Sequence, residues 1–140
     1  MTDPWMTDKE RSERRNRPPR RWRDKFGEAF RGVALGIRGQ SSFFVHFFFG
    51  VLAIATAALL KCDPIEWCLI ITAIGLVMSL ELVNSSIELL FRGLPQEARD
   101  RVAGSLDIAA GAVLMASLAA VIVGVIIFGP RMLGCLELRP

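Results

Sequence analysis

The sequence predicts an all-α membrane protein with one helix at the membrane surface and three helices that span the bilayer. Apolar residues make up 52% of the chain and are gathered in long runs rather than mixed with charges, as is typical of membrane proteins. The runs 43–60 and 108–129 contain no Asp, Glu, Lys or Arg, and each reaches the length of about 18 residues that a spanning helix needs. A third run, 65–91, is also long enough but carries a few polar residues.

The N-terminal segment is strongly basic, with eleven Lys or Arg residues against six acidic ones in 1–38. Residues 1–20 are polar and contain proline, which predicts a disordered tail. A solvated tail near anionic lipid is favoured over nucleic-acid binding, because positive charge beside a membrane span is common. No apolar core of a signal peptide appears before Ser41, so we expect no cleavable targeting segment.

The first helix is predicted over 24–38 as an amphipathic helix lying in the membrane interface. Its apolar residues recur every three or four positions, at Phe26, Phe30, Val33 and Ile37. This spacing places them on one face, with the charged residues on the others. Asp24 is a suitable N-terminal cap and Gly39 a suitable end.

The spanning helices are predicted over 43–60, 65–91 and 107–128, within a single membrane domain over 21–140. A tight outer turn at 61–64 joins the first two, and its Pro64 fits the first turn of a helix. Gly93 and Pro95 break the chain after the second span. The link 92–105 is more basic than the turn at 61–66, so the positive-inside rule places this link and the N-terminus in the cytoplasm.

Three polar residues interrupt the second span at helical spacing: Glu81, Asn84 and Glu88. At about 100° per residue they share one face, and Arg92 continues that face toward the cytoplasmic end. Placing a carboxylate in the bilayer centre costs roughly 2.5–3.5 kcal/mol on insertion scales. Two carboxylates in one span are therefore expected to face a charged or polar partner, an ion or a functional site. A polar seam that joins helices, with Glu88 paired to Arg92, is the structural alternative.

Asp107 favours a functional site over a merely structural polar contact between helices, because it begins the next span on the same side of the membrane. Shallow carboxylates there could hold Mg²⁺ together with phosphate and water, and the deeper Glu81 could act as a base. A lone histidine on an apolar helix, such as His46, more often has a packing role than a functional one, by about three to one. The sequence has no phosphate-binding loop, dinucleotide fingerprint, HExxH motif or zinc-like cysteine spacing.

Several motifs between Arg21 and Phe128 resemble the small prokaryotic diacylglycerol kinase family, which includes undecaprenol kinases. The matching elements are Phe26-xx-Ala29-xx-Gly32, Phe43-xx-His46, Glu81-xx-Asn84-Ser85-x-Ile87-Glu88 and Asp107-Ile108-Ala109-Ala110-Gly111-Ala112-Val113. The last two are the most specific, and no insertion is needed between them.

This resemblance implies a homotrimer in the bacterial inner membrane that transfers the γ-phosphate of ATP to a lipid alcohol at the cytoplasmic interface. Glu81 would be the general base, with Asn84 positioning the hydroxyl. Mg²⁺ would be held by Glu88 and by Gln40, and Asp107 would belong to the nucleotide site. Arg21 and Glu97, which are looser matches, would also contact the nucleotide. Phosphoryl transfer needs mainly positioning and charge neutralisation, which such a set can supply.

The sequence departs from the family pattern at three positions. Gln40 replaces a metal-binding glutamate, Leu106 replaces a lysine and Arg92 replaces an aspartate. These changes keep open a second hypothesis, a catalytically weak or silent relative that serves as a lipid-binding scaffold. A small transporter is a third, but the chain lacks the repeats that would favour it. The acceptor alcohol and the preferred nucleotide are not determined by these motifs.

Overall fold

The computed structural model describes residues 7, 21–38 and 41–137, with side chains described as far as Gly134. The chain divides into two units, Met1–Val33 and Ala34–Pro140. The expected tail over 1–20, apart from Thr7, and the proposed metal ligand Gln40 lie outside the described residues.

Helix α2 occupies Trp22–Ile37, close to the predicted 24–38. Asp24 lies in its first turn, where a negative charge stabilises the helix dipole. None of its residues is buried, and the apolar side chains of Phe26 and Phe30 are exposed. The placement of this helix at a membrane surface stays a prediction.

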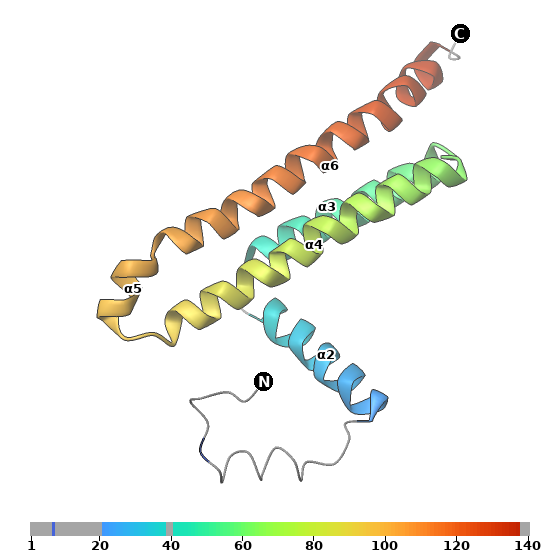
Figure 1. The fold of residues 1–140 in the computed structure, drawn as a ribbon. Coiled ribbons are helices and arrows are strands. Elements are labelled where there is room, and N and C mark those ends of the chain that lie inside the picture. The colour runs from blue at the N-terminus through green and yellow to red at the C-terminus, as the bar shows by residue number, and fades with distance from the viewer. Residues whose placement is uncertain (1–6, 8–20, 39–40, 138–140) are drawn as a thin grey trace. The chain divides into compact units, whose positions relative to one another are not determined.

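Three helices are long and apolar enough to cross a membrane, as the sequence predicts: α3 (Ser41–Leu59), α4 (Pro64–Arg92) and α6 (Gly104–Glu137) (Figure 1). Most of their large apolar side chains are exposed. Such a surface is stable only in an apolar solvent, because lipid contact removes the cost of hydrating it.

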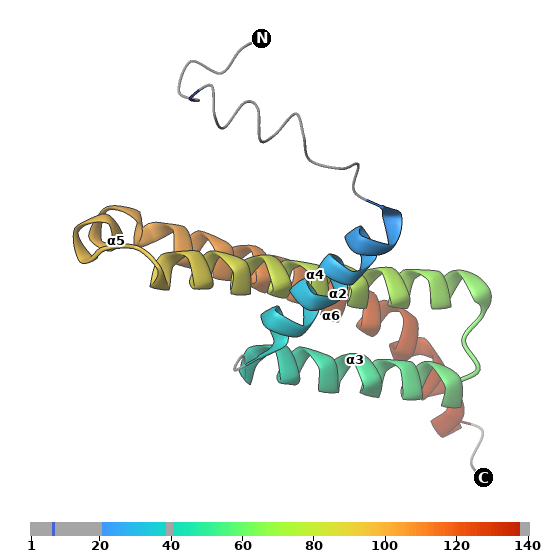
Figure 2. The same ribbon diagram turned by 90° about the horizontal axis from the view of Figure 1, so that it is seen from below.

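Helices α3 and α4 run antiparallel, and α6 packs along α4 (Figures 1 and 2). Few of their apolar residues are buried, and one cluster of these consists of Ala57, Ile70 and Ile127. Gly50 of α3 allows close approach to α4, because a Cβ atom there would lie 3.3 Å from Cγ2 of Ile74.

The turn between α3 and α4 is fixed by a capping box. Asp63 Oδ1 accepts hydrogen bonds from the backbone N–H groups of Ile65 (2.9 Å) and Glu66 (3.0 Å). The Glu66 side chain accepts one from the backbone of Asp63 at 2.8 Å. This reciprocal pattern satisfies N–H groups that the first helical turn leaves unpaired, and Pro64 occupies that turn as predicted.

Arg131, near the end of α6, ties this turn to the third spanning helix. Its Nε and Nη2 atoms donate to the two carboxylate oxygens of Glu66 at 3.0 and 2.6 Å. Its Nη1 donates to the carbonyl oxygens of Leu60 and Lys61, both at 3.2 Å. The planar guanidinium suits this arrangement, since its donors form a rigid fork.

In the charged link after α4, for which the sequence analysis gives no helix, Gln96–Val102 forms a short helix, α5. Arg99 closes the preceding turn by donating to the carbonyl oxygens of Leu94 and Arg92. Helix α6 begins at Gly104, before the predicted 107, and continues through Pro130 to Glu137. Hydropathy marks the apolar part of a helix, so it misses polar turns at either end.

Candidate active site

Glu81 is the most deeply buried charged residue in the described part of the chain, with 2% of its surface exposed. It lies on the face of α4 that meets α3. Ser42 Oγ donates to Glu81 Oε2 at 3.3 Å, and His46 Nε2 lies 3.0 Å from Glu81 Oε1. A buried carboxylate needs such partners, because its desolvation is otherwise costly.

His46 therefore does more than fill space, contrary to the packing role that its isolation in the sequence favours. Its side chain is 24% exposed, so it contacts both the buried carboxylate and the open side of the bundle. Ser42 and His46 are four residues apart and share one face of α3. That spacing, together with the Phe43-xx-His46 match, is the signal from which this pair could have been predicted.

A second polar cluster lies further along α4. Asn84 Nδ2 donates to Glu88 Oε1 at 3.2 Å, and Arg92 Nη2 lies 3.4 Å from Glu88 Oε2. The Glu88–Arg92 pair that the sequence suggested is thus present. Within the described residues Glu81 bonds to α3, whereas Asn84 bonds to Glu88 rather than to Glu81.

Ser85 lies one turn beyond Glu81 and is 5% exposed. Its hydroxyl has no hydrogen-bond partner in the described part of the structure. Buried polar atoms of this kind are rare and deserve an explanation. A hydroxyl with free hydrogen-bonding capacity beside Glu81 adds to the polarity of this region.

The remaining predicted site residues are more dispersed. Glu97 on α5 and Asp107 in the first turn of α6 are both exposed, and the chain brings them to the end of the bundle where α4 ends. Leu106 is partly buried. Arg21 is exposed and belongs to the first unit.

The described donor set suits Mg²⁺ only with help from other ligands. No group of three or more His, Cys, Asp or Glu side chains that could hold a metal is present among residues 21–38 and 41–134. Glu88 offers one partly exposed carboxylate with an amide beside it. Mg²⁺ commonly binds through one or two carboxylates plus phosphate oxygens and water, so Glu88 fits a metal that arrives with a phosphate group.

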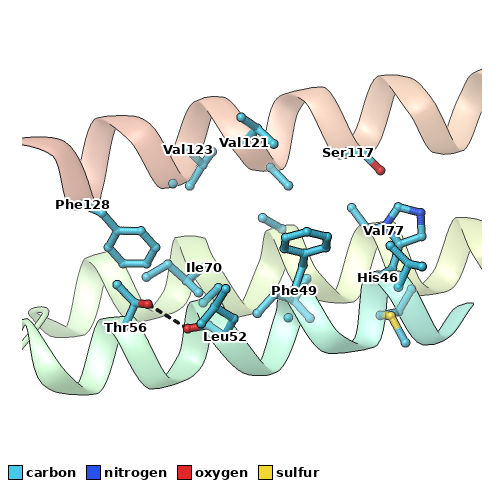
Figure 3. A pocket seen from close by; sticks show the side chains of 18 residues that line it. His46, Phe49, Leu52, Thr56, Ile70, Val77, Ser117, Val121, Val123 and Phe128 are labelled. Carbon is cyan, nitrogen blue, oxygen red and sulfur yellow. Dashed lines mark hydrogen bonds between the residues drawn. The ribbon is translucent and has the colours of Figure 1, made fainter. Parts of the chain in front are cut away.

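An apolar cavity of about 500 Å³ lies between α3, α4 and α6 (Figure 3). His46 and Ser117 are at one end, and Thr56 and Phe128 are at the other. The remaining lining is aliphatic or aromatic, apart from Met78. The cavity therefore begins at the residue that contacts Glu81.

A bundle of three membrane-length helices with a buried carboxylate–imidazole pair beside an apolar cavity defines a small integral membrane protein with a polar site. The chain belongs to the prokaryotic diacylglycerol kinase family, because the model of that family, described as "Prokaryotic diacylglycerol kinase", matches residues 27–128. The resemblance inferred from the sequence motifs is thereby confirmed.

Two curated relatives support this assignment. A diacylglycerol kinase of Synechocystis is 37% identical over 116 residues, which is 82% of this chain and 61% of the relative. An undecaprenol kinase of Bacillus subtilis is 30% identical over 107 residues, which is 76% of this chain and 87% of the relative. The chain thus spans less than two thirds of the Synechocystis protein, and no solved structure matches it significantly.

Proposed function

We propose that this chain is a lipid kinase that transfers the γ-phosphate of ATP to the hydroxyl of a membrane lipid alcohol. The observation that carries the proposal is the buried Glu81 carboxylate, held by Ser42 and by His46, which also lines an apolar cavity. In this proposal the acceptor belongs to the diacylglycerol or undecaprenol class, which the names of the two relatives support.

Glu81 acts as the general base. Its carboxylate takes the proton of the lipid hydroxyl as the lipid oxygen forms a bond to the γ-phosphorus. The bond between that phosphorus and the oxygen it shares with the β-phosphate breaks, and ADP leaves with the electron pair. A positioned base contributes typically 10²–10⁴-fold to such a reaction, and the low exposure of Glu81 keeps water from competing for the base.

Glu88 holds the Mg²⁺ that accompanies ATP, and Asn84 orients the Glu88 carboxylate through its 3.2 Å hydrogen bond. When bound, Mg²⁺ neutralises charge on the transferred phosphate. Gln40 is the second ligand in this proposal. It can offer only a neutral carbonyl oxygen, which makes the site weaker than one with two carboxylates.

The nucleotide binds where α4, α5 and α6 meet, near Asp107 and Glu97, and the nucleotide contact that the family resemblance implies for Arg21 stays a prediction. Arg92 supplies positive charge there, because its side chain is 71% exposed although it pairs with Glu88. This cation can offset the loss of the lysine that Leu106 replaces. The neutralising role follows the general need of phosphoryl transfer for cations around the phosphates.

The same proposal covers orientation and assembly. The basic N-terminal segment and the link after α4 face the cytoplasm of a bacterial inner membrane, by the positive-inside rule. The amphipathic stripe of α2 lies on the membrane surface. The protein works as a homotrimer, and the exposed small and apolar residues of α6 suit close helix packing between copies.

A weakly active or silent scaffold is the second candidate function. The absence of a three-ligand acidic group in the described part of the chain and the apolar Leu106 favour it. Such a protein would bind lipid without transferring phosphate.

The deciding experiment offers labelled ATP, Mg²⁺ and a panel of lipid alcohols to the purified protein in mixed micelles. We expect label in at least one lipid, and a fall of 10²–10⁴-fold in Glu81→Gln. Glu66→Gln is the matched control, since it makes the same change on α4 far from the site and should keep activity. Folded protein that labels no lipid would overturn the kinase and favour the scaffold.

A further inference from the structure

Each turnover of the proposed reaction leaves one proton on Glu81. When the lipid oxygen bonds to the γ-phosphorus its O–H bond breaks, so the phosphate ester and ADP together carry one proton fewer than the alcohol and ATP. Glu81 takes that proton and must give it away before it can act as a base again. With 2% of its surface exposed, Glu81 cannot exchange the proton with water directly, so another group has to accept it.

His46 is the neighbour of Glu81 best suited to accept this proton. Its Nε2 lies 3.0 Å from Oε1 of Glu81, whereas the Ser42 hydroxyl lies 3.3 Å from Oε2 and donates its own proton there. Histidine is the side chain that commonly gains and loses a proton near neutral pH, which a serine hydroxyl does not. Ser85, one turn further along α4, is itself only 5% exposed, so a proton passed to it would stay inside the bundle.

His46 also reaches outward, which Glu81 does not. Its side chain is 24% exposed. It follows the first residue of α3, Ser41, by five positions, or about 7.5 Å of helix, so it lies near the end of the bundle that the charge distribution assigns to the cytoplasm. The apolar cavity that begins at His46 (Figure 3) offers no other route, because the hydroxyls of Thr56 and Ser117 in its lining each donate to a carbonyl of their own helix. The described lining contains no Asp, Glu, Lys or Arg, so the charged group that His46 contacts there is Glu81.

We propose that His46 returns the proton of Glu81 to water after each phosphoryl transfer. The proposal rests on the lipid kinase function above and adds the step that resets its base. The proton moves from Oε1 of Glu81 to Nε2 of His46 while the ring carries its own proton on Nδ1. The imidazolium then releases the Nδ1 proton to water, and Glu81 is ionised for the next acceptor. Exchange of the remaining ring proton through water restores the starting tautomer.

The first test compares the first turnover with the later ones. His46→Gln keeps a hydrogen-bond donor toward Glu81 but cannot take up and release a proton. Full-length protein in mixed micelles is mixed rapidly with labelled ATP, Mg²⁺ and diacylglycerol. We expect the first labelled lipid per chain to form at nearly the wild-type rate and later turnovers to be roughly tenfold slower than in the wild type. That loss is below the 10²–10⁴-fold that positioned proton transfer typically contributes, because water can still accept the proton slowly.

Ser42→Ala is the matched control, because Ser42 lies on the same face of α3 and contacts the other oxygen of the same carboxylate. It should keep the wild-type ratio of first to later turnover rates. Equal slowing of first and later turnovers in His46→Gln would leave His46 only a positioning role and overturn the inference. A slow second turnover in Ser42→Ala but not in His46→Gln would also overturn it, since the proton would then leave through Ser42.

Chemical rescue gives a second readout that a purely structural role would not move. In His46→Ala, added imidazole should raise the steady-state rate with increasing concentration until the effect saturates. Pyrrole, a ring of the same size without a basic nitrogen, should not raise it, and neither ring should rescue Glu81→Gln. Equal recovery with imidazole and pyrrole, or no recovery with imidazole, would overturn the proposal. Should His46→Ala fail to fold, the time course of His46→Gln decides.

These outcomes separate the inference from the kinase function. If folded wild-type protein labels no lipid, the kinase function fails and the proton return fails with it. If the wild type labels lipid and His46→Gln shows the same rates at every turnover, the kinase function stands and only the role of His46 is overturned.

Discussion

Nε2 of His46 on α3 lies 3.0 Å from Oε1 of Glu81 on α4. The contact joins two spanning helices through the most deeply buried carboxylate among the described residues. Ser42 reaches the other oxygen of the same group. The proposed base is therefore held by α3 through both of its carboxylate oxygens, which fixes the plane of the carboxylate.

Replacing His46 should lower turnover more than substrate affinity. A hydrogen bond to a charged group contributes about 1.5–3 kcal/mol, so we expect His46→Ala to reduce kcat roughly tenfold to a hundredfold with the KM for ATP unchanged. His46→Gln keeps a donor and should recover part of the rate. The measurement is steady-state kinetics in mixed micelles.

Ser42→Ala is the matched control for this pair, because it removes only the longer 3.3 Å contact to Glu81. Its effect on kcat should be smaller than that of His46→Ala. A larger effect in Ser42→Ala, or a change in the KM for ATP alone, would argue against a positioning role for His46.

The Glu88 carboxylate should set the requirement for Mg²⁺. Glu88→Gln keeps the shape but removes the charge, and a loss of about 1.4 kcal/mol in metal binding corresponds to a tenfold higher half-activating concentration. Activity should return when Mg²⁺ is raised. A loss that is the same at every Mg²⁺ concentration would instead place Glu88 outside the metal site.

Arg92 should matter for ATP rather than for lipid. Its guanidinium is largely exposed and pairs with Glu88 at 3.4 Å, so it can turn toward phosphate at little cost. Arg92→Ala should raise the KM for ATP about tenfold, a scale reasonable for one charge-assisted contact, and Arg92→Lys should raise it less. Lys61→Ala, at the other end of the bundle, is the control; an unchanged KM in Arg92→Ala would count against the role.

The membrane fold could be predicted from the sequence because apolar runs of bilayer length leave few alternatives. The three spanning helices follow from 43–60, 65–91 and 107–128, and the motif Glu81-xx-Asn84-Ser85 indicates the family. The early start of α6, its passage through Pro130 and the helix α5 could not be predicted in this way. They depend on local hydrogen bonds and packing that hydropathy does not measure.

The candidate site, like the fold, could be predicted from the sequence only in part. Glu81 could be identified from the cost of a carboxylate in a membrane. The spacing of Ser42 and His46 indicates a shared face of α3, but their contact with Glu81 depends on how α3 and α4 rotate against each other. Periodicity places Glu81 and Glu88 on one face of α4, yet the structure turns Glu81 toward α3 and joins Glu88 to Asn84 and Arg92. The i, i+4 pairing of Glu88 with Arg92 could be predicted from the spacing within α4, whereas the pairing of Glu81 with α3 could not.

The bidentate contact between Arg131 and Glu66 should stabilise the outer end of the bundle. Arg131→Gln removes the charge and the fork, which also leaves the carbonyl oxygens of Leu60 and Lys61 without this donor. We expect the Tm in detergent to fall by a few degrees in Arg131→Gln. In Arg131→Lys, which keeps the charge, the Tm should fall less. Activity at low temperature should persist, since this cluster lies far along α4 from Glu81. Equal Tm values in the wild type and both variants would contradict a stabilising role for the contact between Arg131 and Glu66.

The thiol of Cys62 should react slowly at neutral pH. Partial burial raises the pKa of Cys62 above its ordinary value of 9.0, and the nearby Glu66 carboxylate raises it further. Because the thiolate is the nucleophile, its alkylation should speed up with pH and reach half its maximal rate only above pH 9.0. The measurement uses iodoacetamide on a variant with Cys68→Ser and Cys135→Ser, so that Cys62 alone reacts.

Adding Glu66→Gln should shift the midpoint to lower pH, since it removes a negative charge beside the thiolate. A midpoint below 9.0 in the parent variant would show that the Arg131 cation, which acts in the opposite direction, outweighs burial and the carboxylate.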